Sequence, residues 1–311
     1  MTALTTEDKR PLALFIMGPT AAGKTALAVE LVQRLPCDII SVDSAMVYRG
    51  LDIGAAKPDA ATLARAPHRL IDLLDPSEAY SVSRFCADAR AEMDQIVARG
   101  RIPLLVGGSM LYFRALELGL SPLPKADAGV RAELNREIEQ RGLAALHGEL
   151  AQVDPVAAER IHSNDSQRIQ RALEVWRLTG KTLTQLQQQA GEALPFRLLK
   201  WALSPPDRAV LHQRIAQRFE QMLAQGFIDE VRELKARPEL NLDLPSMRSI
   251  GYRQVWQHLD GELNEAELLE RGIIATRQFA KRQLTWLRSY PEVVFYDPEN
   301  LDYEVLLRQI V

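Results

Sequence analysis

The hydrophobic residues in the first half of the chain form short apolar runs that alternate with longer helical repeats. Apolar runs at residues 12–17, 38–42 and 102–106 each end before a glycine or an acidic residue. Short runs of this kind predict buried parallel strands. Helical spacing at 26–35 and 82–99 separates them. The pattern therefore predicts the βαβ alternation of an α/β fold with a doubly wound parallel sheet.

A polar segment follows each of these three predicted strands. They are a glycine-rich loop at 18–25, Asp43, and the triplet Gly107, Gly108 and Ser109. In open α/β sheets, ligands bind at the carboxyl ends of the strands. We therefore expect the three segments to face one crevice, although they are far apart in the sequence.

The pattern changes after residues 121–124, a proline-containing break. Residues 125–190 are rich in Glu, Arg, Gln, Leu and Ala and show no strand pattern, which predicts a helical insertion. An apolar run at 198–203 predicts a return to the sheet, and helical patterns dominate from 208 onward. We predict a core domain of residues 1–123 and 201–311 and a helical insertion domain of residues 124–200.

Composition limits the classes of function. The 311 residues are 47% hydrophobic and 25% charged, which is ordinary for a globular protein of two domains. The net charge of −3 provides no overall basic field, so any RNA site must be a local patch. Cys37 and Cys86 form no CxxC pair, and the five histidines lack ligand spacing. With no leader pattern and no apolar run of about 18 residues, we expect a cytoplasmic protein without a membrane partner.

The glycine-rich loop carries the strongest chemical signal. It lies between a predicted strand and a predicted helix and matches G-x-x-x-x-G-K-[ST], which predicts a P-loop NTPase-like core. Its amides, together with the dipole of the helix that follows, favour phosphate oxygens. Lys24 adds a cation, and the Thr25 hydroxyl predicts a Mg²⁺ ligand. The motif does not identify the phosphorylated molecule. The predicted phosphate-binding residues are Gly18, Pro19, Thr20, Ala21, Ala22, Gly23, Lys24 and Thr25.

Asp43 has two interpretations. At the end of the second strand and opposite a phosphate loop, its carboxylate fits a general base for a hydroxyl or an amine. Alternatively, it caps a helix that starts at Ser44. Ser109 offers a hydroxyl at the end of the third strand and is also a possible helix cap.

Two cationic segments fit an RNA partner. Residues 271–288 hold five cations and no anion, and Arg277, Lys281 and Arg288 share one face of a helix. Such a stripe suits a phosphate backbone, although an ordinary solvated face gives the same pattern. Residues 247–253 mix cations, a glycine and an aromatic; they suit base contact or a packed turn between helices. We interpret residues 67–72 as a structural strand with its flanks.

Taken together, these segments resemble the tRNA dimethylallyltransferase family, the isopentenyltransferases that prenylate an adenosine beside the tRNA anticodon. The similarity spans residues 14–290. Two positions depart from the family's usual pattern: Ser109 and Ala55 each replace a threonine. Ser109 keeps a hydroxyl, whereas Ala55 does not. The resemblance rests on residues 18–25, Asp43, Ser44, Asp52, Gly54, Lys57, Pro58, Pro67, His68, Arg69, Gly107, Gly108, Arg160, His162, Gln167, Arg168, Arg171, Glu174, Ile250, Gly251, Tyr252, Lys281, Arg282, Thr285 and Trp286.

The resemblance implies a fold, an activity and a set of site residues. The loop would hold the diphosphate of dimethylallyl diphosphate together with Mg²⁺, and Arg218 would touch the diphosphate. Asp43 would act as the general base on the exocyclic amine of a flipped adenosine. Catalytic roles are thus expected for Asp43, Thr25, Ser109 and Arg218. The implied tRNA contacts are Asp43, Ser44, Ala45, Met46, Gln167, Arg168, Ile169, Gln170, Arg171, Arg248, Ser249, Ile250, Gly251, Tyr252, Arg253, Lys281, Arg282, Gln283, Leu284, Thr285, Trp286, Leu287 and Arg288.

The main alternative function is a small-molecule or nucleotide kinase with the same loop and Asp43 as its base. A GTPase or RNA-binding NTPase fits less well, because the sequence has no Asn-Lys-x-Asp motif and no acidic residue closes the third strand. Within the prenyltransferase interpretation, we expect the helical insertion to clamp the anticodon stem-loop. The sequence shows no heptad pattern that would indicate a coiled-coil dimer, so we expect a monomer.

Overall fold

The chain forms two compact units. The computed structural model describes residues 9–189 and 191–310. One unit, here called the core unit, combines the chain up to Arg114 with the chain from Pro195 onward. The other, the insertion unit, is Ala115–Leu194. Each unit is described by itself below.

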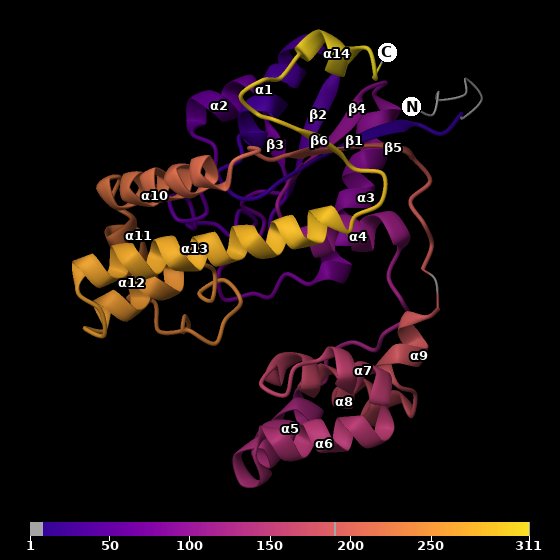
Figure 1. Cartoon of the computed structure of the whole chain (residues 1–311), viewed down its shortest axis with the longest axis vertical. Helices are drawn as coiled ribbons and strands as arrows, with labels where there is room; N and C mark the ends of the chain where they lie inside the picture. Colours follow the sequence, from indigo (N-terminus) through magenta and orange to yellow (C-terminus); the bar gives the residue numbers. More distant parts are fainter. Residues whose placement is uncertain (1–8, 190, 311) are drawn as a thin grey trace. The chain divides into compact units, whose positions relative to one another are not determined.

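A parallel sheet organises the core unit (Figure 1). Its strand order among the described residues is β3-β2-β4-β1-β5-β6, and every neighbouring pair is parallel. The predicted α/β fold with a doubly wound sheet is confirmed, as are the strands expected at 12–17, 38–42, 102–106 and 198–203. The strands are β1 (Leu12–Met17), β2 (Cys37–Val42), β3 (His68–Arg69), β4 (Ile102–Gly107), β5 (Arg197–Leu203) and β6 (Val294–Tyr296).

Helices cover both faces of the sheet. Leu14 and Ile16 of β1 belong to an apolar cluster with α1 and α14. Phe15 points to the other face, where the centroid of its ring lies 5.0 Å from that of Phe113 in α4. This alternation follows from the two-residue period of a strand. The helices of the core unit are α1 (Lys24–Arg34), α2 (Ala60–Arg65), α3 (Val82–Ala98), α4 (Met110–Leu118, ending in the insertion unit), α10 (Arg208–Ala224), α11 (Phe227–Lys235), α12 (Tyr252–Leu259), α13 (Glu265–Arg288) and α14 (Tyr303–Leu307).

Strand register brings the three polar segments together. Gly107, the last residue of β4, pairs with Met17 on one side and with Val42 on the other. The residues that follow these three strands are Gly18, Asp43 and Gly108. All three segments therefore begin at the same edge of the sheet, as the sequence predicted.

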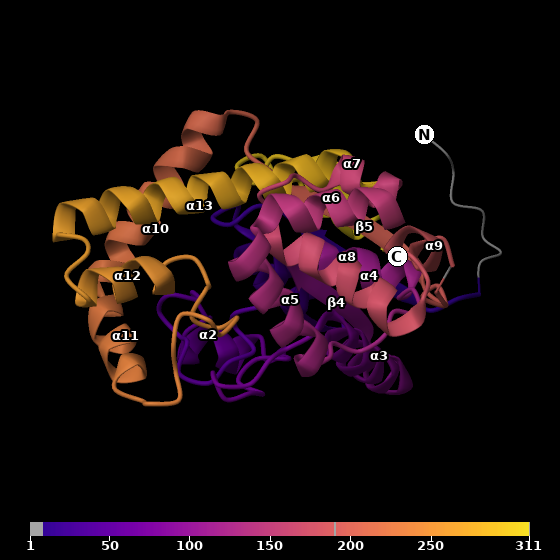
Figure 2. The same ribbon diagram turned by 90° about the horizontal axis from the view of Figure 1, so that it is seen from below.

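A helical layer from the second half of the chain completes the core unit. In Figures 1 and 2, α10, α11 and α12 gather around the first half of the long helix α13. Phe219 of α10 lies so close to Gly272 of α13 that a Cβ there would meet the ring at 2.0 Å. Phe219 also packs edge-on against Phe227 of α11. The glycine therefore lets α10 and α13 approach closely.

All the regular secondary structure in the described residues of the insertion unit is helical. Leu134, Leu146, Leu150, Ile169 and Leu173 form the centre of its own apolar core. The predicted bounds of this unit, 124 and 200, both differ from the observed ones, Ala115 and Leu194. Strand β5 pairs with β1 from Arg197 onward and so belongs to the core unit. The insertion unit's own helices, after the end of α4, are α5 (Ala128–Arg141), α6 (Leu143–Val153), α7 (Pro155–Arg160), α8 (Ser166–Thr179) and α9 (Leu183–Gln187).

None of the helices in the described part of the chain combines the length and apolar character needed to cross a bilayer.

Candidate active site

The glycine-rich loop folds into a cradle between β1 and α1. Ala21 and Gly23 take positive φ angles of 63° and 86°, which turns successive amides toward one side. Helix α1 begins at Lys24, two residues earlier than predicted, and no side chain caps its N-terminus. The amides of its first turn are therefore available to an anion.

A cavity of about 200 Å³ opens at this cradle. It is lined by the loop from Thr20 to Thr25, by Asp43, and by the glycines at the end of β4. Thr25 and Lys24 thus face the same space as Asp43, as predicted. The remaining lining residues are Ser41, Met46, Ala55, Ala56, Pro58, His68, Val106, Arg218, Phe279 and Gln283.

Two cations at the cradle form no ion pair with any described residue. The Lys24 ammonium donates to the carbonyls of Gly18 (3.1 Å) and Pro19 (2.7 Å). Burial, followed by the charge of Arg218, lowers the pKa of Lys24 to about 7, and Asp43 opposes this change. Burial also lowers the pKa of Arg218, which has no hydrogen bond or ion pair with any described residue. An incoming diphosphate would meet both cations.

Asp43 holds a turn and leaves one oxygen open. Its Oδ1 accepts hydrogen bonds from the amides of Ala45 (2.8 Å) and Met46 (3.3 Å). The suggested helix at Ser44 does not form, so the carboxylate caps a turn and not a helix. No donor among the described residues reaches Oδ2. That oxygen is therefore available to take a proton from a substrate.

A second, larger cavity of about 360 Å³ adjoins the first. The two share Thr20, Ala21, Asp43, Ala55, Arg218 and Phe279 in their linings. The larger one adds Ser109 and an apolar group from α10, which contains Ile215, Phe219 and Met222. We call the first cavity the phosphate end, after its predicted ligand, and the second the apolar end; Asp43 lines both.

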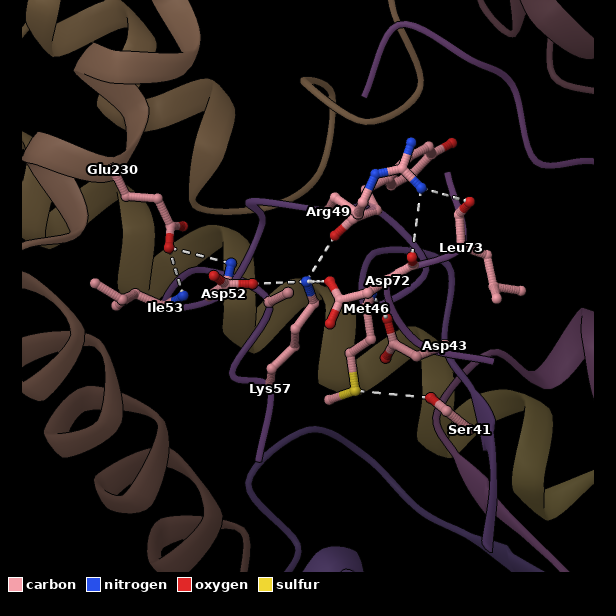
Figure 3. A network of polar contacts seen from close by, with 12 residues as sticks. Ser41, Asp43, Met46, Arg49, Asp52, Ile53, Lys57, Asp72, Leu73 and Glu230 are labelled. Atoms are coloured by element: carbon pink, nitrogen blue, oxygen red, sulfur yellow. Dashed lines mark hydrogen bonds and ion pairs between the residues drawn. The ribbon is translucent and has the colours of Figure 1, made fainter. Parts of the chain in front are cut away.

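A hydrogen-bonded loop forms one wall of both cavities (Figure 3). The Glu230 carboxylate accepts from the amides of Asp52 (3.1 Å), Ile53 (2.6 Å) and Gly54 (3.2 Å), and from the Tyr252 hydroxyl (2.7 Å). Tyr252 in turn accepts from the amide of Ala55 at 3.1 Å. Ala55 therefore fixes the wall through its backbone.

Lys57 closes the other side of this loop. Its ammonium donates to the Tyr48 carbonyl (2.6 Å) and to the carboxylates of Asp52 (2.6 Å) and Asp72. Figure 3 shows Lys57 between the two carboxylates, with Glu230 approaching the loop from the opposite side. Burial, followed by the charge of Glu230, raises the pKa of Tyr252 well above its usual value, so Tyr252 stays a hydroxyl donor.

Comparison with known proteins identifies the family. A family model described as IPP transferase matches residues 46–290, and one described as isopentenyl transferase matches residues 12–72. The chain belongs to the IPP transferase family. The resemblance seen in the sequence is confirmed.

Solved structures support this assignment. A tRNA isopentenylpyrophosphate transferase from Bacillus halodurans is 39% identical, with 97% of this chain and 94% of that one covered and a TM-score of 0.69. A tRNA delta(2)-isopentenylpyrophosphate transferase from Staphylococcus epidermidis is 31% identical, with 97% of each chain covered and a TM-score of 0.69. A eukaryotic dimethylallyltransferase acting on tRNA is 26% identical, covers 96% of this chain and 78% of its own, and has a TM-score of 0.80.

The larger cavity gathers several positions for which the family resemblance implied tRNA contact. These come from the turn after β2 and from the segment before α12. They are joined by Arg282 of α13, whose neighbour Gln283 lies in the phosphate-binding cavity instead. The implied tRNA-contacting residues that line the larger cavity are Asp43, Ser44, Ala45, Arg248, Ser249, Ile250, Gly251 and Arg282.

Other implied tRNA contacts on α13 lie away from this cavity. Lys281, Leu284, Thr285 and Arg288 line a separate space of about 270 Å³ together with Arg277, Arg208 and His212. Trp286 is 37% exposed, and its ring lies against the Arg114 guanidinium. Leu287 and Gln283 are buried, and so is Tyr252 on α12. Leu287 and Tyr252 line none of the cavities described here, whereas Gln283 and Met46 line the phosphate end and Arg253 is exposed.

The insertion unit carries the remaining implied contacts. Gln167 and Arg168 are exposed, whereas Ile169 belongs to the core of the unit. Gln170 donates to Asn135 at 2.7 Å. Arg171 donates to the buried carboxylate of Glu174 (2.6 Å) and to the Pro124 carbonyl. The exposed pair is thus the accessible part of this segment.

Sequence reasoning missed several residues that build the site. Phe279 lines both cavities, and His68 lines the phosphate end, where burial lowers its pKa and favours the neutral ring. Glu230 holds backbone amides of the wall, and its only sequence signal is a polar residue on a helix, which does not identify a partner. For Gln283 the resemblance implied tRNA contact, but it gave no sign of the hydrogen bond to the Thr20 amide.

The residues at the cradle fit a magnesium ion. No group of three or more His, Cys, Asp or Glu residues with metal-binding geometry occurs among the described residues. Mg²⁺ bound to a diphosphate usually needs only one or two protein ligands, because phosphate oxygens and water complete its shell. The Thr25 hydroxyl, with Asp43 across the same cavity, meets this requirement.

Proposed function

We propose that the chain transfers the dimethylallyl group of dimethylallyl diphosphate to the exocyclic amine of an adenosine beside the tRNA anticodon, with release of diphosphate. The observation that carries the proposal is the position of Asp43. It lines both the phosphate-binding cavity and the apolar cavity, where a donor and an acceptor would meet. The alternative, a kinase, is not favoured by the family to which the chain belongs.

The phosphate end would bind and activate the leaving group. Amides of the loop, Lys24 and Arg218 would meet the diphosphate oxygens as the bond from the allylic carbon to oxygen breaks. Mg²⁺ held near Thr25 would supply further neutralisation of that charge. Ser109 offers a hydroxyl at the end of the cavity where the allylic carbon would lie.

Asp43 would act on the acceptor. The amine of adenine is a poor nucleophile because its lone pair is delocalised into the ring. Hydrogen bonding to Oδ2 would orient the amine toward the allylic carbon, and the proton would move to the carboxylate as the nitrogen–carbon bond forms. The adenosine would have to leave its stack to reach Asp43, which makes base flipping part of the mechanism.

Local cationic surfaces would bind the tRNA, because the net charge of −3 gives no overall attraction. The exposed cations of α13 would follow the backbone, and Gln167 and Arg168 of the insertion unit would reach the anticodon stem-loop. We propose a monomer that works in the cytoplasm. The two unpaired cysteines, Cys37 and Cys86, support a reducing compartment.

A direct assay tests the proposal. Purified protein is incubated with unmodified tRNA, dimethylallyl diphosphate and Mg²⁺, and the nucleosides are analysed by mass spectrometry. We expect adenosine to gain one five-carbon unit at a single position next to the anticodon. Omitting the donor, or replacing it with ATP, is the control. Phosphorylation of a small hydroxylated metabolite by ATP, with no change in the tRNA, would establish the kinase function instead.

A further inference from the structure

Gln283 links the helix proposed to bind tRNA to the loop proposed to bind diphosphate. It lies on α13 between the exposed residues Arg282 and Thr285, yet its own side chain is only 4% exposed. Its Oε1 accepts from the amide of Thr20 at 2.9 Å, and its Nε2 donates to the carbonyl of Gly108 at 2.9 Å. One side chain therefore holds both the cradle, at Thr20, and the residue that follows β4.

Two features show that this bridge is built into the fold. A Cβ on Gly108 would meet the Gln283 Nε2 at 2.2 Å, so the second glycine of the pair makes room for the amide. The bridge also uses the amide of Thr20, and Pro19 has no amide hydrogen. The amide of Thr20 is therefore used by the bridge and not left for an anion.

We propose that Gln283 is a positioning residue for the diphosphate donor and the coupling element between donor and tRNA binding. By fixing Thr20, it sets the direction of the amides that follow. Any shift of α13 when tRNA binds its exposed face moves the Gln283 amide, and with it the cradle. Linkage then requires that tRNA and diphosphate change one another's affinity by the same factor. This inference deepens the proposed function and rests on it for the identity of the tRNA partner.

The test uses inorganic diphosphate with Mg²⁺ as its probe, so that the donor half does not depend on which prenyl donor the enzyme uses. Gln283→Met keeps the length of the side chain but removes both hydrogen bonds. We expect the Kd for diphosphate, measured by calorimetry, to rise about tenfold. We also expect the effect of tRNA on that Kd to shrink toward unity. Gln213→Met, an exposed glutamine on α10 that lines none of the three cavities described above, is the matched control.

A second variant separates positioning from general destabilisation. In Gln283→Glu, a neutral carboxylic acid has one donor and one acceptor and so replaces both hydrogen bonds, whereas the ionised form cannot donate to Gly108. We expect its diphosphate affinity to recover toward wild type as the pH falls. Lys24, Asp43, Arg218, His68 and the diphosphate itself also titrate or carry charge at the cradle, so the readout is the ratio of the variant to wild type at each pH. A merely structural role gives a constant ratio.

The outcomes are distinct. Wild-type diphosphate affinity in folded Gln283→Met, with a raised KM for tRNA alone, would overturn the proposal and place Gln283 on the tRNA side only. Weakened diphosphate binding with an unchanged tRNA effect would overturn the coupling. If wild-type protein fails to prenylate tRNA, the function proposed above is wrong, while the diphosphate measurement still tests the positioning role.

Discussion

The two ends of the active-site pocket are built in different ways. The phosphate end is centred on one continuous segment, the loop from Thr20 to Thr25, which presents backbone amides, and residues from several other segments complete its lining. The apolar end is assembled from side chains of α10, α13 and the segment before α12, which are far apart in the sequence. Asp43 lies at the boundary and lines both.

This difference separates generic from specific recognition. Backbone amides recognise the geometry of a diphosphate and are insensitive to what the diphosphate carries. Side chains at the apolar end decide the size and shape of the group that fits. Substitutions at the two ends should therefore have separate kinetic signatures, and the following predictions test that separation.

The largest effect is expected for Asp43, which lines both ends of the pocket. Asp43→Ala should lower the single-turnover rate by about 10²–10⁴-fold, because a general base contributes that much. Binding of tRNA and of dimethylallyl diphosphate should change far less. Rapid-quench measurements with saturating substrates check this, with Asp59→Ala on the surface as control. A rate near that of wild type would remove Asp43 from catalysis.

The next effect concerns the phosphate end. Lys24→Ala should weaken dimethylallyl diphosphate binding by about 10–100-fold, since a hydrogen bond to a charged group contributes about 1.5–3 kcal/mol. Thr25→Ala should chiefly raise the Mg²⁺ concentration needed for half-maximal rate. Equilibrium binding and a magnesium titration give the two values. An equal loss of tRNA affinity would contradict the division between the ends.

The cations of α13, of which Lys281 and Arg288 are exposed and Arg277 is partly buried, should affect binding at neither end of the pocket. Replacing Arg277, Lys281 and Arg288 with Ala should weaken tRNA binding and reduce the slope of log K against log salt by about one unit for each lost phosphate contact. The KM for dimethylallyl diphosphate should stay close to wild type. Filter binding between 50 and 200 mM salt measures this slope, because affinity that depends on phosphate contacts falls strongly over that range of salt concentration. An unchanged slope would identify this face as ordinary solvated surface.

A smaller effect is expected at the apolar end. Met222→Ala enlarges the cavity without removing a fully buried side chain. The ratio of kcat/KM for a ten-carbon allylic diphosphate to that for the five-carbon donor should rise about tenfold, because one or two methylene groups change discrimination by about 1–3 kcal/mol. Diphosphate affinity should not change. If the ratio stays at the wild-type value, the prenyl group lies elsewhere.

The smallest effect is a pH dependence that arises at Lys24. Its pKa of about 7 in the folded protein lies below that of an exposed lysine, so Lys24 loses its proton as the pH rises through 7. Diphosphate favours the protonated form. Affinity should therefore fall several-fold between pH 6.5 and about 8, and binding at pH 8 should take up a proton. Calorimetry in buffers of different ionisation enthalpy measures the uptake, and Lys24→Met should abolish the part that belongs to the lysine.

The same difference between the ends explains what the sequence could predict. The strands before the loop, Asp43 and Gly107 were predictable because each is a buried apolar run that ends in a residue with a special role. Strand β6 was missed, because it has only three residues and its Val294 and Phe295 are about half exposed. The family resemblance pointed to residues 248–253 and 281–288, yet it did not separate Arg282, which faces the cavity, from Leu287, which is buried. Which of these side chains faces the cavity depends on how the helices pack, and the sequence does not show this packing.

The carboxylate of Glu230 gives the wall of the site an unexpected kind of selectivity. Three successive amides, those of Asp52, Ile53 and Gly54, converge on it, as they would on a phosphate group. The Glu230 carboxylate thus occupies a group of amides that could otherwise bind a free anion. A free anion would have to displace this carboxylate to bind at the wall, whereas no side chain caps the N-terminus of α1. We therefore expect the diphosphate to bind at the cradle and not at the wall.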